Sequence, residues 1–134
     1  MLFRKEDGLL AAADIAAAND PSLTWSQFID NFRASDEATR RKIVRDEPAN
    51  VPGADPAFAA FVAATVEALC NEVGMPPPQW VFHARFVLSE PAWGINNIKN
   101  PETLAAARAL LRAESLPEFA ARNLFYGANV LSRV

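Results

Sequence analysis

Apolar and polar residues follow each other along this chain mostly with the spacing of amphipathic helices. The clearest case starts at Thr24, after which apolar residues recur at i, i+3, i+4 and i+7. These residues are Trp25, Phe28, Ile29 and Phe32. Thr24 and Gln27 also have the spacing of a capping box. We therefore predict a helix that begins at Thr24 and buries an aromatic face.

Residues 56–73 form the most apolar segment with helical spacing. Large apolar side chains recur along it, and alanine fills half of the other positions. The large residues are Phe58, Phe61, Val62, Val66, Leu69 and Val73. Asp55 and Pro56 are suited to the start of this helix, and Gly74 to its end. A helix that is apolar on nearly every side needs neighbours on nearly every side, so we predict that it lies at the centre of a bundle.

Two more helices are predicted before this central helix. The alanine-rich stretch from Leu9 to Ala18 favours a helix that ends at Asn19. Ser35 or Asp36 caps another, which carries a basic run and is stopped by Pro48.

The helical pattern is shorter and more broken after the central helix. A short helical segment is expected from Gln79 to Leu88, and Asn100 with Pro101 begins another helix. Ser115 and Glu118 repeat the capping-box spacing, and residues 124–127 suggest a short extended piece. The pattern as a whole predicts an all-α fold, a compact bundle of about five to six short helices around residues 56–73, with residues 1–134 in a single helical domain.

Composition supports a folded chain. The 134 residues are 51% hydrophobic and 22% charged, as is ordinary for a globular protein. Cys70 is the one cysteine and lies within an apolar helical pattern, so we interpret it as a core residue and expect a reducing, cytoplasmic setting. We expect neither a secretion signal nor a membrane-spanning segment.

Candidate chemistry is sparse. The chain has one histidine, His83, and its five glycines are dispersed, so neither a multi-histidine metal site nor a glycine-rich phosphate loop is expected. A nucleophilic pair of Cys70 and His83 would need an accessible thiolate, which the predicted core position disfavours. We predict no enzymatic activity and no cofactor.

A basic run is the strongest polar feature. It consists of Arg40, Arg41, Lys42 and Arg45. Within residues 24–47, two helices that meet near Ser35 could form a helix-turn-helix that contacts nucleic acid with these side chains. Acidic residues flank the run and the net charge is −3, so a solvated surface is the favoured interpretation and DNA binding stays an alternative.

Aromatic residues crowd between Trp80 and Trp93 in a segment interrupted by proline. We take the candidate contacts for a protein partner from this segment: Trp80, Phe82, Arg85, Phe86 and Trp93. Trp and Arg dominate many protein interfaces, although a core role for the aromatic residues is the favoured interpretation.

Three short motifs carry a family resemblance. P-P-P-Q-W ends at Trp80, L-S-E-P-A-W ends at Trp93, and E-S-L-P-E-F-A-A-R-N-L-F ends at Phe125. Across about Trp25 to Val134 the chain resembles small helical bacterial proteins that are encoded beside nucleotidyltransferase-like toxins and act as their antitoxins. The resemblance implies a protein that blocks the active site or nucleotide pocket of a toxin, and it assigns no catalytic residue.

The predicted function is therefore a non-catalytic protein-binding module, antitoxin-like, whose partner is a protein such as a toxin. The alternative is a DNA-binding regulator, and association of the chain with itself stays open.

Overall fold

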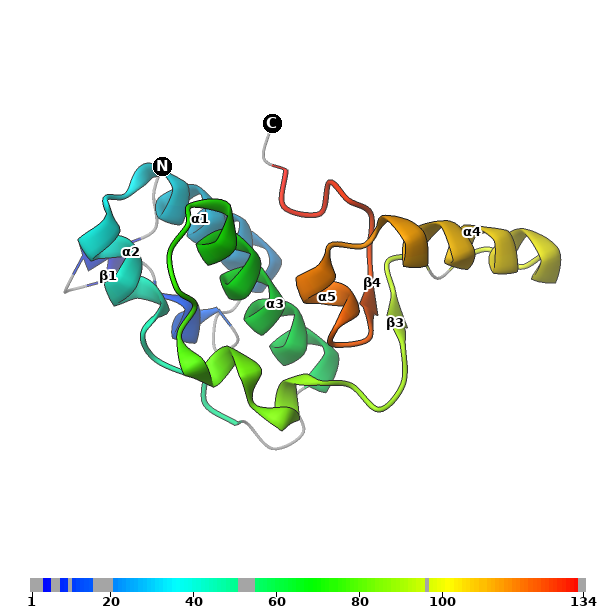
Figure 1. Ribbon diagram of the computed structural model, residues 1–134, viewed down its shortest axis with the longest axis horizontal. Coiled ribbons are helices and arrows are strands. Elements are labelled where there is room, and N and C mark those ends of the chain that lie inside the picture. Colours follow the sequence, from blue (N-terminus) through cyan, green and yellow to red (C-terminus); the bar gives the residue numbers. More distant parts are fainter. Residues whose placement is uncertain are drawn as a thin grey trace.

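The computed structural model describes residues 4–5, 8–9, 11–15, 21–50, 55–95 and 97–132 (Figure 1). The described part is mostly helical, which confirms the all-α prediction. Its elements in chain order are β1 (Arg4–Lys5), β2 (Gly8–Leu9), the 3₁₀ turn η1 (Ala12–Asp14), α1 (Pro21–Ala34), α2 (Glu37–Val44), α3 (Pro56–Glu72), the 3₁₀ turns η2 (Gln79–Phe82) and η3 (Ala84–Phe86), β3 (Ala92–Trp93), α4 (Pro101–Glu114), α5 (Pro117–Ala120) and β4 (Leu124–Phe125).

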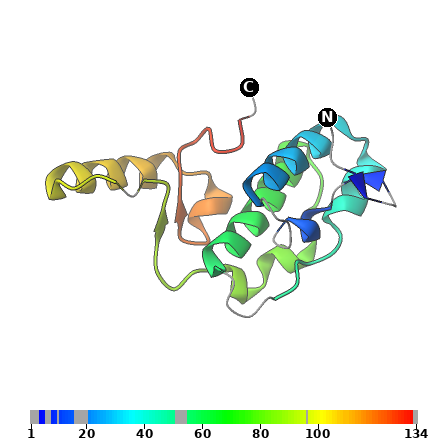
Figure 2. The same ribbon diagram turned by 180° about the vertical axis from the view of Figure 1, so that it is seen from behind.

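Helix α3 is the centre of the fold, as predicted. Asp55 caps its first turn by accepting a hydrogen bond of 2.9 Å from the Ala57 amide, and Gly74 ends it with a left-handed φ of 72°. Helices α1 and α5 and the turns η2 and η3 pack around α3 (Figures 1 and 2). Its buried residues are Ala60, Val62, Ala63, Ala64, Thr65, Val66, Ala68, Leu69 and Cys70.

Helix α1 has the predicted aromatic face but an earlier start. Phe28, Ile29 and Phe32 are fully buried, and Trp25 is partly buried against the core. The helix begins at Pro21, so the capping box predicted at Thr24 and Gln27 is wrong. Proline is favoured in the first helical turn, where its missing amide hydrogen costs nothing, and Thr24 instead lies inside the helix and is buried.

The helix predicted from Leu9 to Ala18 is also wrong within the described residues. Leu9 belongs to β2, which pairs antiparallel with β1, and a single 3₁₀ turn follows. The Asp14 carboxylate accepts a hydrogen bond of 3.0 Å from the Ala11 amide, which favours this turn over a continuous helix. Residues 10 and 16–18 of the predicted helix lie outside the described residues.

Helix α2 follows the prediction closely. Asp36 caps it by accepting a hydrogen bond of 2.9 Å from the Thr39 amide, and Ile43 and Val44 are buried on its inner face. Two residues, Ser35 and Asp36, separate it from α1.

Two later helices differ from the sequence-based expectation. Residues 79–88 form the two 3₁₀ turns η2 and η3, separated at His83, whose backbone is extended with ψ of 143°. The capping box predicted at Ser115 and Glu118 is absent, because Leu116 occupies the N-cap of α5 while Ser115 ends α4. The Ser115 hydroxyl lies 2.6 Å from the Leu111 carbonyl oxygen, so it serves the preceding helix.

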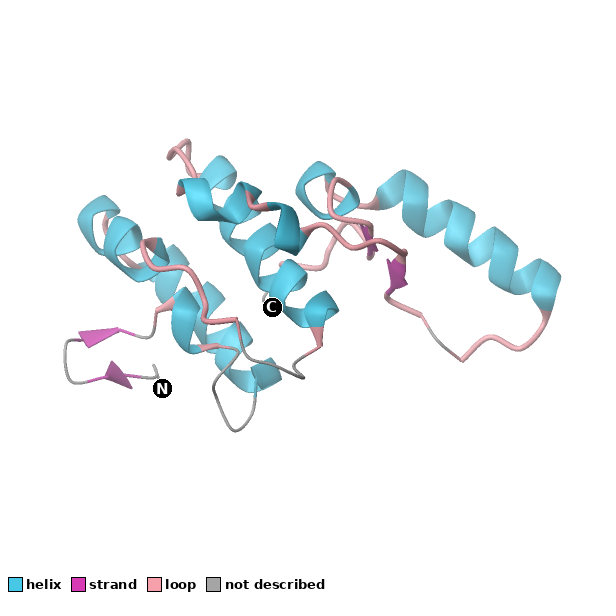
Figure 3. Ribbon diagram, turned by 90° about the horizontal axis from the view of Figure 1, so that it is seen from below, coloured by secondary structure: helices cyan, strands magenta, loops and turns pink. Residues whose placement is uncertain are grey.

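The C-terminal part returns to the bundle through a short parallel pair of strands. Ala92 is opposite Leu124 and Trp93 is opposite Phe125, which confirms the extended piece predicted near residue 124. Between β3 and β4, α4 projects away from the bundle (Figures 1 and 3). Its start at Asn100 and Pro101 is as predicted, with Asn100 accepting a hydrogen bond of 3.0 Å from the Thr103 amide. No helix of the described residues has the length and apolar character needed to cross a bilayer.

Candidate functional site

The predicted partner-binding residues do not form one surface. Trp80 and Phe86 are buried and pack edge to face with ring centroids 5.6 Å apart. The Trp80 indole donates a hydrogen bond of 2.9 Å to the Val44 carbonyl oxygen, which ties η2 to the end of α2. Both rings therefore belong to the core, whereas Phe82 has 59% of its surface exposed.

Arg85 has a structural role beside them. Its guanidinium lies 4.1 Å from the centre of the Phe86 ring and donates a hydrogen bond of 3.0 Å to Glu47. The Nδ1 atom of His83 lies 2.8 Å from the other carboxylate oxygen of Glu47. These contacts hold η3 against the segment that follows α2, so Arg85 is committed within the chain.

Trp93 lies at the base of α4, away from the other four. Its ring stacks on Phe125, with centroids 4.8 Å apart and planes inclined by 29°. The guanidinium of Arg108 lies 5.1 Å from the centre of the Trp93 ring, and that of Arg112 lies 5.0 Å from the centre of the Phe125 ring. These cation–π contacts attach the second half of α4 to the strand pair.

We call α4 the arm, because none of its 14 residues is buried. Leu110 exposes 58% of its surface. Four alanines are exposed beside it, and the spacing of 3.6 residues per turn places these five residues on one continuous face. The outer face of the arm consists of Ala105, Ala106, Ala109, Leu110 and Ala113.

The basic run is divided between one partly buried side chain, Arg40, and three exposed ones. Arg40 donates hydrogen bonds of 2.9 and 3.1 Å to the carbonyl oxygens of Phe32 and Arg33, and so completes the end of α1. Arg41 and Lys42 on α2 and Arg45 just after it are exposed. They line an open groove whose opposite wall is the triple proline, residues 76–78. Arg41 pairs with Glu37 at 3.4 Å and Arg45 with Asp46 at 3.2 Å, which reduces the positive charge of this groove.

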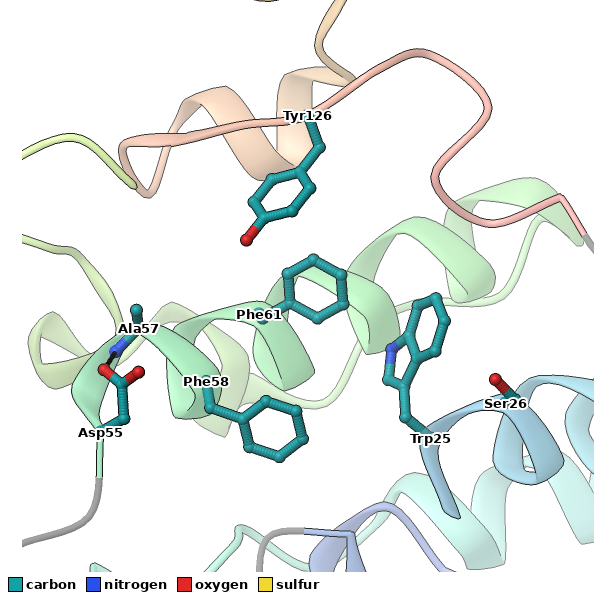
Figure 4. Close-up of a pocket in the computed structure, with 7 residues that line it drawn as sticks. All are labelled: Trp25, Ser26, Asp55, Ala57, Phe58, Phe61 and Tyr126. Carbon is teal, nitrogen blue, oxygen red and sulfur yellow. Dashed lines mark hydrogen bonds between the residues drawn. The ribbon is translucent and has the colours of Figure 1, made fainter. Parts of the chain in front are cut away.

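A separate pocket lies between α1, the start of α3 and the segment after β4 (Figure 4). Its volume is about 340 Å³. Four aromatic residues and one carboxylate dominate its lining: Trp25, Phe58, Phe61, Tyr126 and Asp55. We call it the aromatic pocket, and no sequence motif had indicated it, because its residues come from distant parts of the chain.

Three of the four rings of the aromatic pocket are held by contacts with their neighbours. The Trp25 indole donates a hydrogen bond of 2.9 Å to the Thr65 hydroxyl, which donates in turn to the Phe61 carbonyl oxygen at 2.8 Å. The Phe61 ring lies 5.2 Å from that of Trp25 and 5.0 Å from that of Tyr126, centre to centre. The pocket is thus formed before any ligand enters.

Charge in the aromatic pocket has one sign. Asp55 is exposed at its rim, and the residues that line the pocket include no lysine or arginine. Burial raises the pKa of Tyr126 above its usual value, and the negative charge of Asp55 raises it further. The phenol therefore stays protonated at neutral pH, beside a carboxylate.

The candidate nucleophile pair has the wrong surroundings for catalysis. Cys70 is fully buried in α3, and burial raises the pKa of its thiol to about 11. Its thiolate is therefore scarce at neutral pH and shielded from solvent. Among the described residues no group of three or more histidine, cysteine, aspartate or glutamate side chains is placed to bind a metal ion.

The sequence matches no protein-family model and no curated protein, and the fold matches no solved structure.

Proposed function

We propose that this chain is a non-catalytic protein-binding module and that the arm is its docking element. The observation that carries the proposal is a 14-residue helix with no buried residue. Isolated helices shorter than about 12–15 residues are only marginally stable in water, and most helices in proteins are stabilised by packing of an apolar face. The outer face of the arm has no such packing within the described residues.

The chemistry of the outer face indicates the kind of partner. Four alanines and a leucine allow close approach and carry no charge, and Glu102 lies on the same face only in the first turn of the helix. The complementary surface is therefore an apolar groove that receives a helix. An antitoxin-like role fits this form of binding, since a helix inserted into the cleft of a nucleotidyltransferase-like toxin blocks access to its nucleotide. The proposed setting is the bacterial cytoplasm, with the partner encoded beside the gene for this chain.

Co-expression with the product of the adjacent gene tests the proposal. We expect a stable complex in size-exclusion chromatography with light scattering, and we expect Ala109→Glu to abolish it because a carboxylate is then placed in the apolar contact. Ala38→Glu is the matched control, since Ala38 is an exposed alanine on α2, and it should leave the complex intact.

Three results would contradict the proposal. They are the absence of a complex, a complex that survives Ala109→Glu, and a homodimer that forms without the partner and is broken by Ala109→Glu. The last result would assign the outer face to a second copy of the chain. Phe82→Asp, at the most exposed residue of the earlier predicted cluster, tells whether that residue also contributes.

DNA binding through α2 is the second candidate, supported by the exposed Arg41, Lys42 and Arg45 along the groove. Each phosphate contact contributes about −0.9 to the slope of log affinity against log salt concentration. If all three side chains bind phosphate, their replacement by alanine should lower the magnitude of this slope by about 2 to 3. Equal retention of the two proteins on DNA at low salt would rule this candidate out.

A further inference from the structure

We propose that the aromatic pocket binds an alkylammonium cation. The rings of Trp25, Phe58, Phe61 and Tyr126 line it, and the Asp55 carboxylate stands at its rim (Figure 4). This inference rests on the pocket alone and does not depend on the function proposed for the arm.

The faces of aromatic rings attract cations. The π electrons give each ring a negative face, so a cation that contacts several rings gains an attraction from each while its methyl groups are removed from water. Trp and Tyr, the stronger partners in such contacts, are both present. A pocket formed mainly by aromatic rings therefore favours a cationic, partly apolar group over a neutral or anionic one.

The single carboxylate adds to this preference. One carboxylate oxygen of Asp55 accepts a hydrogen bond from the Ala57 amide at the start of α3. This bond holds the carboxylate at the rim of the pocket. No lysine or arginine lines the pocket to neutralise it. The same carboxylate would repel an anion, which disfavours phosphates and carboxylates as ligands.

The size and rigidity of the pocket suit a small group. Its volume of about 340 Å³ lies at the lower end of the range for small-molecule sites, about 300–1,000 Å³. The hydrogen bond from Trp25 to Thr65 and the contacts of Phe61 with two other rings hold the walls in place. Little ordering is then required on binding, which favours affinity for a ligand with few atoms.

Choline and its neutral carbon isostere 3,3-dimethyl-1-butanol provide a direct test, because they share shape and differ in charge. We expect choline to bind with a millimolar Kd in calorimetry and to shift the indole N–H resonance of Trp25. The isostere should bind about tenfold more weakly or not at all. Equal binding of both, or no binding of choline at the highest soluble concentration, would overturn the proposal.

Variants identify the contributions of ring and carboxylate. Phe58→Leu keeps an apolar side chain without a π face, and Asp55→Asn removes the charge but keeps a residue that caps helices well. Each should weaken choline binding about threefold to tenfold. Phe82→Leu is the matched control, an exposed aromatic residue outside the pocket, and should leave the Kd unchanged. A loss of binding in the control alone, or unchanged binding in both pocket variants, would contradict the assignment.

A second titration distinguishes two sources of the cation. A short peptide with one trimethyllysine presents the same group on a protein chain, and its unmethylated form is the control. Tighter binding of the methylated peptide than of choline assigns the pocket to a modified protein tail, and the reverse order assigns it to a free small molecule. Both outcomes support an alkylammonium site, and failure of both ligands overturns it.

Discussion

Gly94 and Tyr126 are packed so closely that a Cβ atom on Gly94 would lie 2.8 Å from Cδ2 of the Tyr126 ring. Gly94 follows β3, where the chain leaves the bundle for the arm, and its amide donates a hydrogen bond of 3.0 Å to Phe125. The Tyr126 amide also donates a hydrogen bond of 3.0 Å to the Ser115 hydroxyl, where the chain returns from the arm. The same tyrosine forms one wall of the aromatic pocket, so the base of the arm and the pocket share a side chain.

Gly94→Ala should therefore displace the Tyr126 ring. Overpacking of this kind destabilises proteins by about 1–3 kcal/mol, and we expect a loss in that range from denaturant unfolding. Gly127→Ala is the matched control, since the nearest atom to a new Cβ there is the movable Asn129 side-chain oxygen. Equal losses in the two variants would show that the tyrosine contact is not the cause.

Arg122 provides a second prediction, because it is a buried charge with three partners. Its guanidinium donates to Glu67 at 2.7 Å and to the carbonyl oxygens of Glu118 and Val81 at 2.6 and 2.7 Å. Arg122→Met leaves these acceptors without their donor and should cost about 3–5 kcal/mol of unfolding free energy.

Arg41→Met is the surface control for that experiment. The pair of Arg41 with Glu37 is well exposed, so its loss should cost less than about 1 kcal/mol. Urea unfolding of both variants measures the difference, and similar costs would contradict a dominant role for the buried pair.

Because Cys70 is buried, we expect the folded protein to lose stability at alkaline pH. Burial raises the pKa of its thiol from 9.0 to about 11 in the folded state. Between these values the unfolded chain releases the proton while the folded chain keeps it, so the free energy of unfolding falls as the pH rises from about 9 to 11. The thiol should also react with a disulfide reagent at pH 8 only as fast as the chain unfolds.

Cys70→Ala isolates this contribution. Over the same pH interval the unfolding free energy of the variant should fall by about 2–3 kcal/mol less than that of the parent chain. This is the free energy that corresponds to a shift of about two pKa units. Tyr126, whose pKa is also raised by burial, is retained in both proteins and contributes equally. Identical pH profiles would show that the thiol does not carry the effect.

We expect backbone amide hydrogens to exchange at different rates in the arm and in the bundle. Since no residue of α4 is buried, its amides should exchange with solvent much faster than those of α3. Asn100→Ala removes the hydrogen bond to the Thr103 amide and should speed exchange in the first turn of the arm, with little change in Tm. A substantial fall in Tm would mean that the arm folds together with the bundle.

Sequence patterns predicted the elements whose signals are local. Asp36, Asp55 and Asn100 cap the helices expected of them, because a cap needs only a side chain and an amide two or three residues later. Spacing alone failed at Ser115, where the same hydroxyl serves the end of the preceding helix. It also failed at Thr24, since a proline three residues earlier had already begun the helix.

The candidate sites were harder to predict because they depend on distant contacts. Nothing in the periodicity of α4 shows that no other helix among the described residues covers it. The aromatic pocket combines Trp25, Phe61 and Tyr126 from three separate segments, and its arrangement follows only from the packing of α1, α3 and the C-terminal segment. Trp80 and Trp93 are close in sequence, yet one is in the core and the other at the base of the arm.

Gly94 and Ser115 both contact Tyr126, and this arrangement has a consequence for how the arm can evolve. The excursion between them starts and finishes at almost the same place, so its length is nearly independent of the bundle. Descendants of this protein can gain or lose helical turns there, each moving the tip by about 5.4 Å, without rebuilding the scaffold. Diversity among its natural homologues should therefore concentrate in insertions and deletions between these two positions.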